Sequence, residues 1–175
     1  MNKRIKDMSL AAVLLAIGQV LPFITGQIPQ IGKMLSPMHY PILLCGFFCG
    51  EYYGALIGFI CPLLRSVLFG MPVFFPSAVG MAFELMTYGF VSGILSKKIG
   101  TDSYPKICMI LIISMIAGRL TWGLAQIFLL GLNGSVFTIE AFLAGALFNA
   151  IPGIILQILI LPFIVHYFKN VKRIV

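Results

Sequence analysis

Long apolar runs dominate this sequence, and they constrain its fold more than any other feature. Hydrophobic residues make up 60% of the 175 positions, charged residues only 10%, and the mean hydropathy is +1.06. Globular proteins are about half apolar and a quarter charged, so the composition predicts an all-α integral membrane protein. At about 20 residues per spanning helix, the chain has room for six spans but not for a separate soluble domain. We therefore expect residues 1–175 to form a single transmembrane domain.

Turn-forming residues separate the apolar runs and set the expected ends of the helices. The first run follows a basic N-terminus, as in a signal peptide, but no small-residue cleavage site comes after it, so we interpret it as a retained span. The second run is short. The resulting prediction is a bundle of six transmembrane helices, over residues 5–24, 40–49, 52–69, 77–96, 107–130 and 139–168.

The distribution of basic residues predicts the orientation of this bundle. The two tails and the connection between the fourth and fifth spans hold nine of the twelve Lys and Arg residues, whereas the loops on the opposite face hold only Lys33. Cytoplasmic loops carry the excess of Lys and Arg, so both termini are predicted to be cytoplasmic. The net charge of +7 follows from this topology and does not require a nucleic acid as partner. The nine residues are Lys3, Arg4, Lys6, Lys97, Lys98, Lys106, Lys169, Lys172 and Arg173.

Three ionisable side chains, Arg65, Glu84 and Arg119, lie inside the predicted spans. A charge at the bilayer centre costs about 3 kcal/mol or more, so such residues usually face a cavity, a partner or a substrate. In the predicted orientation they fall in the outer half of the membrane together with Asn149 of the sixth span. We therefore expect these four residues to line a substrate pocket that opens to the exterior.

The charged residues of this pocket indicate what kind of ligand it would bind. Two Arg face one Glu, so one positive charge needs a partner other than Glu84. A ligand carboxylate would supply it, since the planar guanidinium binds carboxylates in a bidentate way. The competing interpretation is purely structural: Arg65 or Arg119 pairs with Glu84 to hold helices together.

Cysteine and histidine do not suggest a metal site or a bound cofactor. The four cysteines lie in apolar stretches, where a thiol behaves as a small hydrophobe, and no His or carboxylate stands near Cys45 and Cys49. His166 is expected at the membrane interface and His39 in a loop.

Small residues recur at helical spacing in two places. Gly46, Gly50, Gly54 and Gly58 are four residues apart, a spacing that lets helix backbones approach closely in lipid. Ala12 and Ala16 form an AxxxA pattern near the cytoplasmic entry of the first span, where they could form a docking patch for another subunit.

The combination of about six spans, a short basic N-terminus and the AxxxA pattern resembles the substrate-binding S component of energy-coupling factor (ECF) vitamin transporters. In that resemblance, Ala12 and Ala16 contact a transmembrane coupling subunit, and residues 25–40, with Gln30, Lys33 and His39, form a gating loop. Such a subunit captures its vitamin from outside. It then works with the coupling subunit and two cytoplasmic ATPases, and topples in the membrane to release its cargo. The chain has no GxxxxGK[ST] motif, so ATP hydrolysis must come from a partner.

Three segments are similar to a pantothenate-type subgroup of this family: LSPMHYPILLCGFFCG from Leu35, PLLRSVLFGMP from Pro62 and MAFELMTYG from Met81. Pantothenate offers a carboxylate for an Arg, and hydroxyl and amide groups for Glu84 and Asn149. Biotin would also satisfy an Arg, whereas the cation thiamine would fit poorly.

Two other classes of membrane protein compete with this interpretation. An intramembrane enzyme would need paired carboxylates, an HExxH cluster or a nucleophile with a base in reach, and the spans hold one carboxylate, Glu84. A stand-alone secondary transporter of a small organic anion such as biotin is the alternative, although such carriers commonly show two related halves, and no convincing repeat is present here. Transport without any ATPase would distinguish it.

Overall fold

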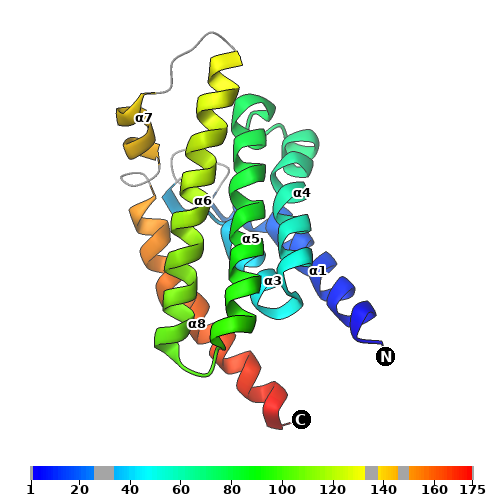
Figure 1. Ribbon diagram of the computed structural model, residues 1–175. Helices are drawn as coiled ribbons and strands as arrows, with labels where there is room; N and C mark the ends of the chain where they lie inside the picture. Colours follow the sequence, from blue (N-terminus) through cyan, green and yellow to red (C-terminus); the bar gives the residue numbers. More distant parts are fainter. Residues whose placement is uncertain (1, 26–33, 133–137, 146–149, 175) are drawn as a thin grey trace.

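The computed structural model describes residues 2–25, 34–132, 138–145 and 150–174, and every regular element in these ranges is a helix (Figure 1). Five of the described helical segments are long and apolar enough to cross a membrane: Lys3–Ile24, Glu51–Phe69, Phe74–Ile99, Tyr104–Leu132 and Ile151–Phe168. The elements in chain order are α1 (Lys3–Val20), η1 (Leu21–Thr25), α3 (His39–Cys49), α4 (Glu51–Phe69), η2 (Phe74–Ala78), α5 (Val79–Ile99), α6 (Tyr104–Leu132), α7 (Ile139–Leu143) and α8 (Ile151–Ile174).

The expected count of six spanning helices is not confirmed. The second expected segment is present as α3, but its 11 residues are too few to cross a bilayer. The single helix expected over 139–168 is wrong, because the chain forms the short α7 and then the separate α8. Pro152 lies in the first turn of α8, where the missing backbone donor of proline costs no helical hydrogen bond and its fixed φ suits the start of a helix.

Two glycines end helices at positions that other residues would strain. Gly50 joins α3 to α4 with a φ of 92°, and Gly70 ends α4 with a φ of 70°. Residues with a Cβ rarely adopt positive φ, whereas glycine does so freely. The sharp turn at Gly50 folds α3 back beside α4.

Helix α5 lies at the centre of the bundle and packs against α3, α4 and α6. Its backbone lies against the glycine stripe, as we call Gly46, Gly50, Gly54 and Gly58. A Cβ built on Gly54 would lie 2.6 Å from the carbonyl oxygen of Gly89. Gly46 and Gly58 face the α5 backbone in the same way. The predicted close packing of this stripe is confirmed for these three glycines, while Gly50 serves the turn.

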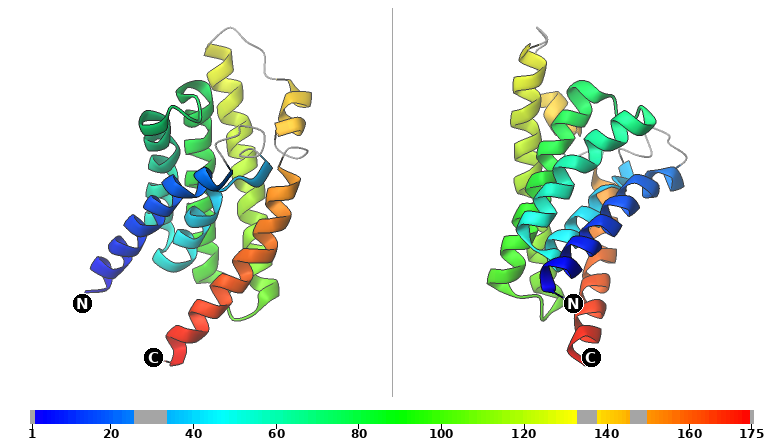
Figure 2. Two further views of the ribbon diagram at one scale, coloured as in Figure 1. Left: turned by 180° about the vertical axis from the view of Figure 1, so that it is seen from behind. Right: turned by 90° about the vertical axis from the view of Figure 1, so that its right-hand side faces the viewer.

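Helices α4, α5 and α6 run roughly parallel or antiparallel to one another, whereas α1 crosses the bundle at a marked tilt (Figure 2). The start of α1, the end of α8 and the connection between α5 and α6 lie at one end of the bundle (Figure 1). Lys97 and Lys98, in the last turn of α5, lie at this same end. The arrangement agrees with the expected grouping of the basic segments, and their cytoplasmic location stays a prediction.

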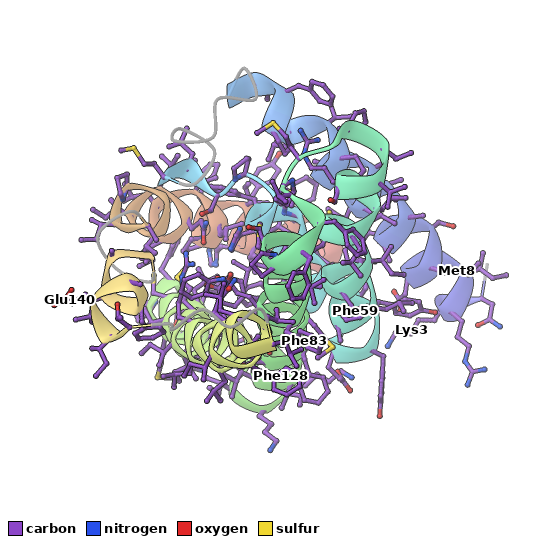
Figure 3. All side chains as sticks on the ribbon, turned by 90° about the horizontal axis from the view of Figure 1, so that it is seen from above. Lys3, Met8, Phe59, Phe83, Phe128 and Glu140 are labelled. Atoms are coloured by element: carbon purple, nitrogen blue, oxygen red, sulfur yellow. The ribbon has the colours of Figure 1, made fainter. Side chains whose placement is uncertain are left out.

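Large apolar side chains cover the outside of the bundle. Val67, Leu124 and Leu159 are 72%, 70% and 67% exposed, and Phe59, Phe83 and Phe128, labelled in Figure 3, are also exposed. Such a surface would be unfavourable in water and suits lipid, while the backbone groups are satisfied within the helices. The structure thus supports a multi-pass membrane protein.

Candidate functional site

A buried ion pair joins α5 to α6. The Oε1 atom of Glu84 lies 2.9 Å from Nη1 of Arg119, and the two side chains are 2% and 16% exposed. Seen from above, nitrogen and oxygen atoms gather in the middle of the bundle, enclosed by the helices (Figure 3). Of the two arginines considered as partners of Glu84, Arg119 is therefore the one that pairs with it.

Two further side chains converge on the same oxygen of Glu84. The hydroxyl of Tyr88 donates to Oε1 at 3.0 Å, and Nε2 of His39 lies 3.4 Å from it. His39 is the first residue of α3 and only 3% exposed, so its expected position in a loop is wrong. We call His39, Glu84, Tyr88 and Arg119 the Glu84 cluster; three helices, α3, α5 and α6, build it.

Arg65 lies in a different environment, near the C-terminal ends of α1 and α4. Its Nη1 donates to the backbone carbonyl of Gln19, and its guanidinium lies 5.0 Å and 5.1 Å from the ring centroids of Phe23 and Phe69. The side chain is buried, at 3% exposure. Among the described residues, no carboxylate lies within 4.0 Å of it.

The packing of α4 on α5 relates Arg65 to the Glu84 cluster. Gly58 of α4 faces the carbonyl of Leu85 on α5, and the two helices are antiparallel, so Arg65 lies farther than Glu84 from the end of the bundle that holds the start of α1 and the end of α8. By helical rise, the separation along the bundle axis is about 9 Å. The structure therefore brings Glu84 and Arg119 together and holds Arg65 about two turns away.

The other predicted site residues have different outcomes. Asn149, Gln30 and Lys33 lie outside the described residues. Ala12 and Ala16 are exposed on α1, whereas Ala11 beside them is buried against the core.

Sequence reasoning missed several contacts of these two environments. Tyr88 stands four residues after Glu84 on one helix, a spacing that places the two side chains on the same face. No local sequence pattern indicates the contact of His39 with Glu84, because the two residues are 45 positions apart in the chain. The same is true of Gln19, whose side chain donates to the carbonyl of Cys61 at 3.0 Å.

An apolar groove of about 360 Å³ lies apart from the Glu84 cluster, between α6 and α7. Leu120, Leu124, Ile127 and Phe142 contribute to its walls. The three aliphatic residues are more than half exposed, so the groove belongs to the apolar outer surface. Its lining offers little to orient a polar vitamin.

Comparison with known proteins identifies one family. The model of the ECF transporter substrate-specific component matches residues 6–165 of this chain. No curated protein matches, and no solved structure matches.

Proposed function

This chain belongs to the substrate-specific components of ECF transporters, and from that premise we propose that its substrate is pantothenate. Members of the family bind a small molecule in the membrane and work with an ECF module that hydrolyses ATP. In the proposal, the chain captures pantothenate outside the cell and delivers it inward. The three segments that resemble the pantothenate-type subgroup support this choice of vitamin.

The observation that carries the proposal is the unbalanced charge of Arg65. Arg119 has a carboxylate partner in Glu84, whereas the described part of the chain offers Arg65 only a carbonyl and two aromatic rings. A carbonyl and ring faces stabilise a guanidinium without neutralising it, and an isolated charge away from water is costly. A ligand carboxylate beside Arg65 would remove this imbalance.

The Glu84 cluster suits the other end of the same molecule. Its charges already balance, so it favours uncharged hydroxyl and amide groups over a second anion. Pantothenate carries a carboxylate at one end and hydroxyl groups at the other, with an amide between them. An extended ligand can therefore contact Arg65 with one end and the Glu84 cluster with the other. Asn149 is proposed as an additional hydrogen-bonding residue.

Binding by the purified protein tests the choice of vitamin. Radiolabelled pantothenate should bind saturably to the chain in detergent or nanodiscs, and unlabelled pantothenate should compete with it. Biotin shares the carboxylate but has no hydroxyl, so it should compete weakly, and riboflavin should not compete. Saturable binding of biotin with no binding of pantothenate would contradict the proposal.

A further inference from the structure

The two ring nitrogens of His39 have different surroundings. Nε2 lies 3.4 Å from Oε1 of Glu84. Nδ1 is buried and, within the described part of the chain, has no hydrogen-bond partner. Buried polar atoms are nearly always hydrogen-bonded, so an exception calls for an explanation such as an absent ligand.

The surroundings of Glu84 determine which nitrogen of His39 carries the proton. Glu84 forms an ion pair with Arg119, and an ionised carboxylate can only accept hydrogen bonds. The nitrogen that faces it, Nε2, must therefore carry hydrogen. A second proton on the ring would add an unbalanced positive charge to a cluster whose charges already cancel. Nδ1 is thus a bare acceptor that needs a donor.

Arg119 presents the opposite requirement in the same cluster. Its Nη1 binds Glu84, but its Nε is buried and has no hydrogen-bond partner among the described residues. The Nε–H group is a donor that needs an acceptor. His39 contacts Glu84 through Nε2 and Arg119 contacts it through Nη1, so each residue keeps a second buried polar atom for a ligand group.

We infer that His39 is a further specificity-determining residue, whose Nδ1 accepts a hydrogen bond from one hydroxyl group of the ligand. This inference rests on the proposed function, since it assigns the hydroxyl end of the substrate. A carboxylate cannot donate to Nδ1, and an ammonium group cannot accept from Arg119. A hydroxyl group can donate to Nδ1 and still accept a hydrogen bond at the same oxygen.

Two substitutions of His39 separate its two nitrogens. In His39→Gln the amide nitrogen can replace Nε2 as donor to Glu84, while the acceptor at Nδ1 is lost. In His39→Asn the amide oxygen can replace Nδ1, while the contact with Glu84 is lost. Both variants are first checked for a single symmetric peak in gel filtration.

The binding experiment uses pantothenate and two analogues, each with one hydroxyl replaced by hydrogen. For the wild type, one analogue should bind about three- to tenfold more weakly than pantothenate, the effect of one hydrogen bond. His39→Gln should bind pantothenate weakly and that analogue equally weakly, because the hydroxyl no longer has its acceptor. His39→Asn should still discriminate between the two. If His39→Gln discriminates as strongly as the wild type, the inference is overturned. A purely structural role of His39, or a water on Nδ1 that the ligand never displaces, would give this result.

A second measurement does not depend on the identity of the vitamin. The chain has two histidines, so ¹⁵N-histidine labelling with a His166→Gln variant assigns the NMR signals of His39. We expect an unprotonated Nδ1 and a protonated Nε2 in the ligand-free protein. A protonated Nδ1 would overturn the inference. If pantothenate fails to bind but Nδ1 is unprotonated, the choice of vitamin is wrong and the acceptor role of His39 is supported.

Discussion

Glu84 and Arg119 neutralise each other inside the bundle, with 2.9 Å between Oε1 and Nη1. The pair joins α5 to α6 and gathers His39 and Tyr88 around the same carboxylate. It also distinguishes the two buried arginines, because Arg65 has no carboxylate partner in the described part of the chain. The ion pair is therefore expected to support the fold, and Arg65 to bind the ligand.

Removing the charge of Glu84 should destabilise the protein. Glu84→Gln leaves Arg119 buried without its counter-ion, and breaking a buried pair in this way costs about 3 to 5 kcal/mol. The expected result is a clear fall in the midpoint of thermal unfolding in detergent, measured by circular dichroism. Glu140→Gln is the matched control, since Glu140 is exposed at the rim of the bundle (Figure 3). Equal midpoints for the two variants would show that the ion pair contributes nothing to stability.

Substitution of Arg65 should weaken binding more than it weakens the fold. Arg65→Ala removes a charge-assisted hydrogen bond worth about 1.5 to 3 kcal/mol, so pantothenate affinity should fall roughly tenfold to a hundredfold. Arg65→Lys should restore only part of it, because lysine lacks the planar fork of the guanidinium. Isothermal titration with both variants measures these effects. Normal binding by Arg65→Ala would mean that the ligand carboxylate lies elsewhere.

The close contact of α4 with α5 should not tolerate a side chain at Gly89. A Cβ at this position would overlap the backbone of Gly54, so Gly89→Ala should cost about 1 to 3 kcal/mol in stability. Gly131→Ala makes the same chemical change in α6, where the added methyl group meets nothing within 4 Å. Because alanine favours helix more than glycine does, the control should be neutral or slightly stabilised. A stable, active Gly89→Ala protein would show that these helices can move apart at little cost.

Bulky residues at Ala12 or Ala16 should block transport and leave binding intact. Both alanines are exposed on α1, and a tryptophan there would hold a partner helix away from the close seam proposed for the coupling subunit. ATP-dependent uptake by the reconstituted complex should be lost in Ala12→Trp and Ala16→Trp, while the purified variants bind pantothenate normally. Ile17→Trp is the control, since this exposed position lies about 100° around the helix from Ala16. Unimpaired uptake would place the seam elsewhere; uptake by the wild type without any ATPase would instead favour a stand-alone carrier.

Several features of the fold could be predicted from local patterns. The bounds of α3 and α4 agree with the expected segments to within one residue. The turn at Gly50 separates the two apolar runs, and a glycine between such runs indicates a turn in the sequence alone. The spacing of Gly46, Gly54 and Gly58 likewise predicted a close helix contact. The division of the last expected span into α7 and α8 was not predicted, since both helices are apolar and hydropathy alone does not locate a helix end.

The sequence by itself determined the class of protein, the apolar helices and the presence of buried charges, because these depend on composition and on neighbours along the chain. Only the tertiary structure decided that Glu84 pairs with Arg119, that His39 joins them, and that Arg65 packs between Phe23 and Phe69. His39 and Glu84 are 45 residues apart, and Arg65 and Gln19 are 46 apart. Whether such residues meet depends on the tilt, rotation and register of packed helices, and these follow from many small contacts summed over the whole bundle.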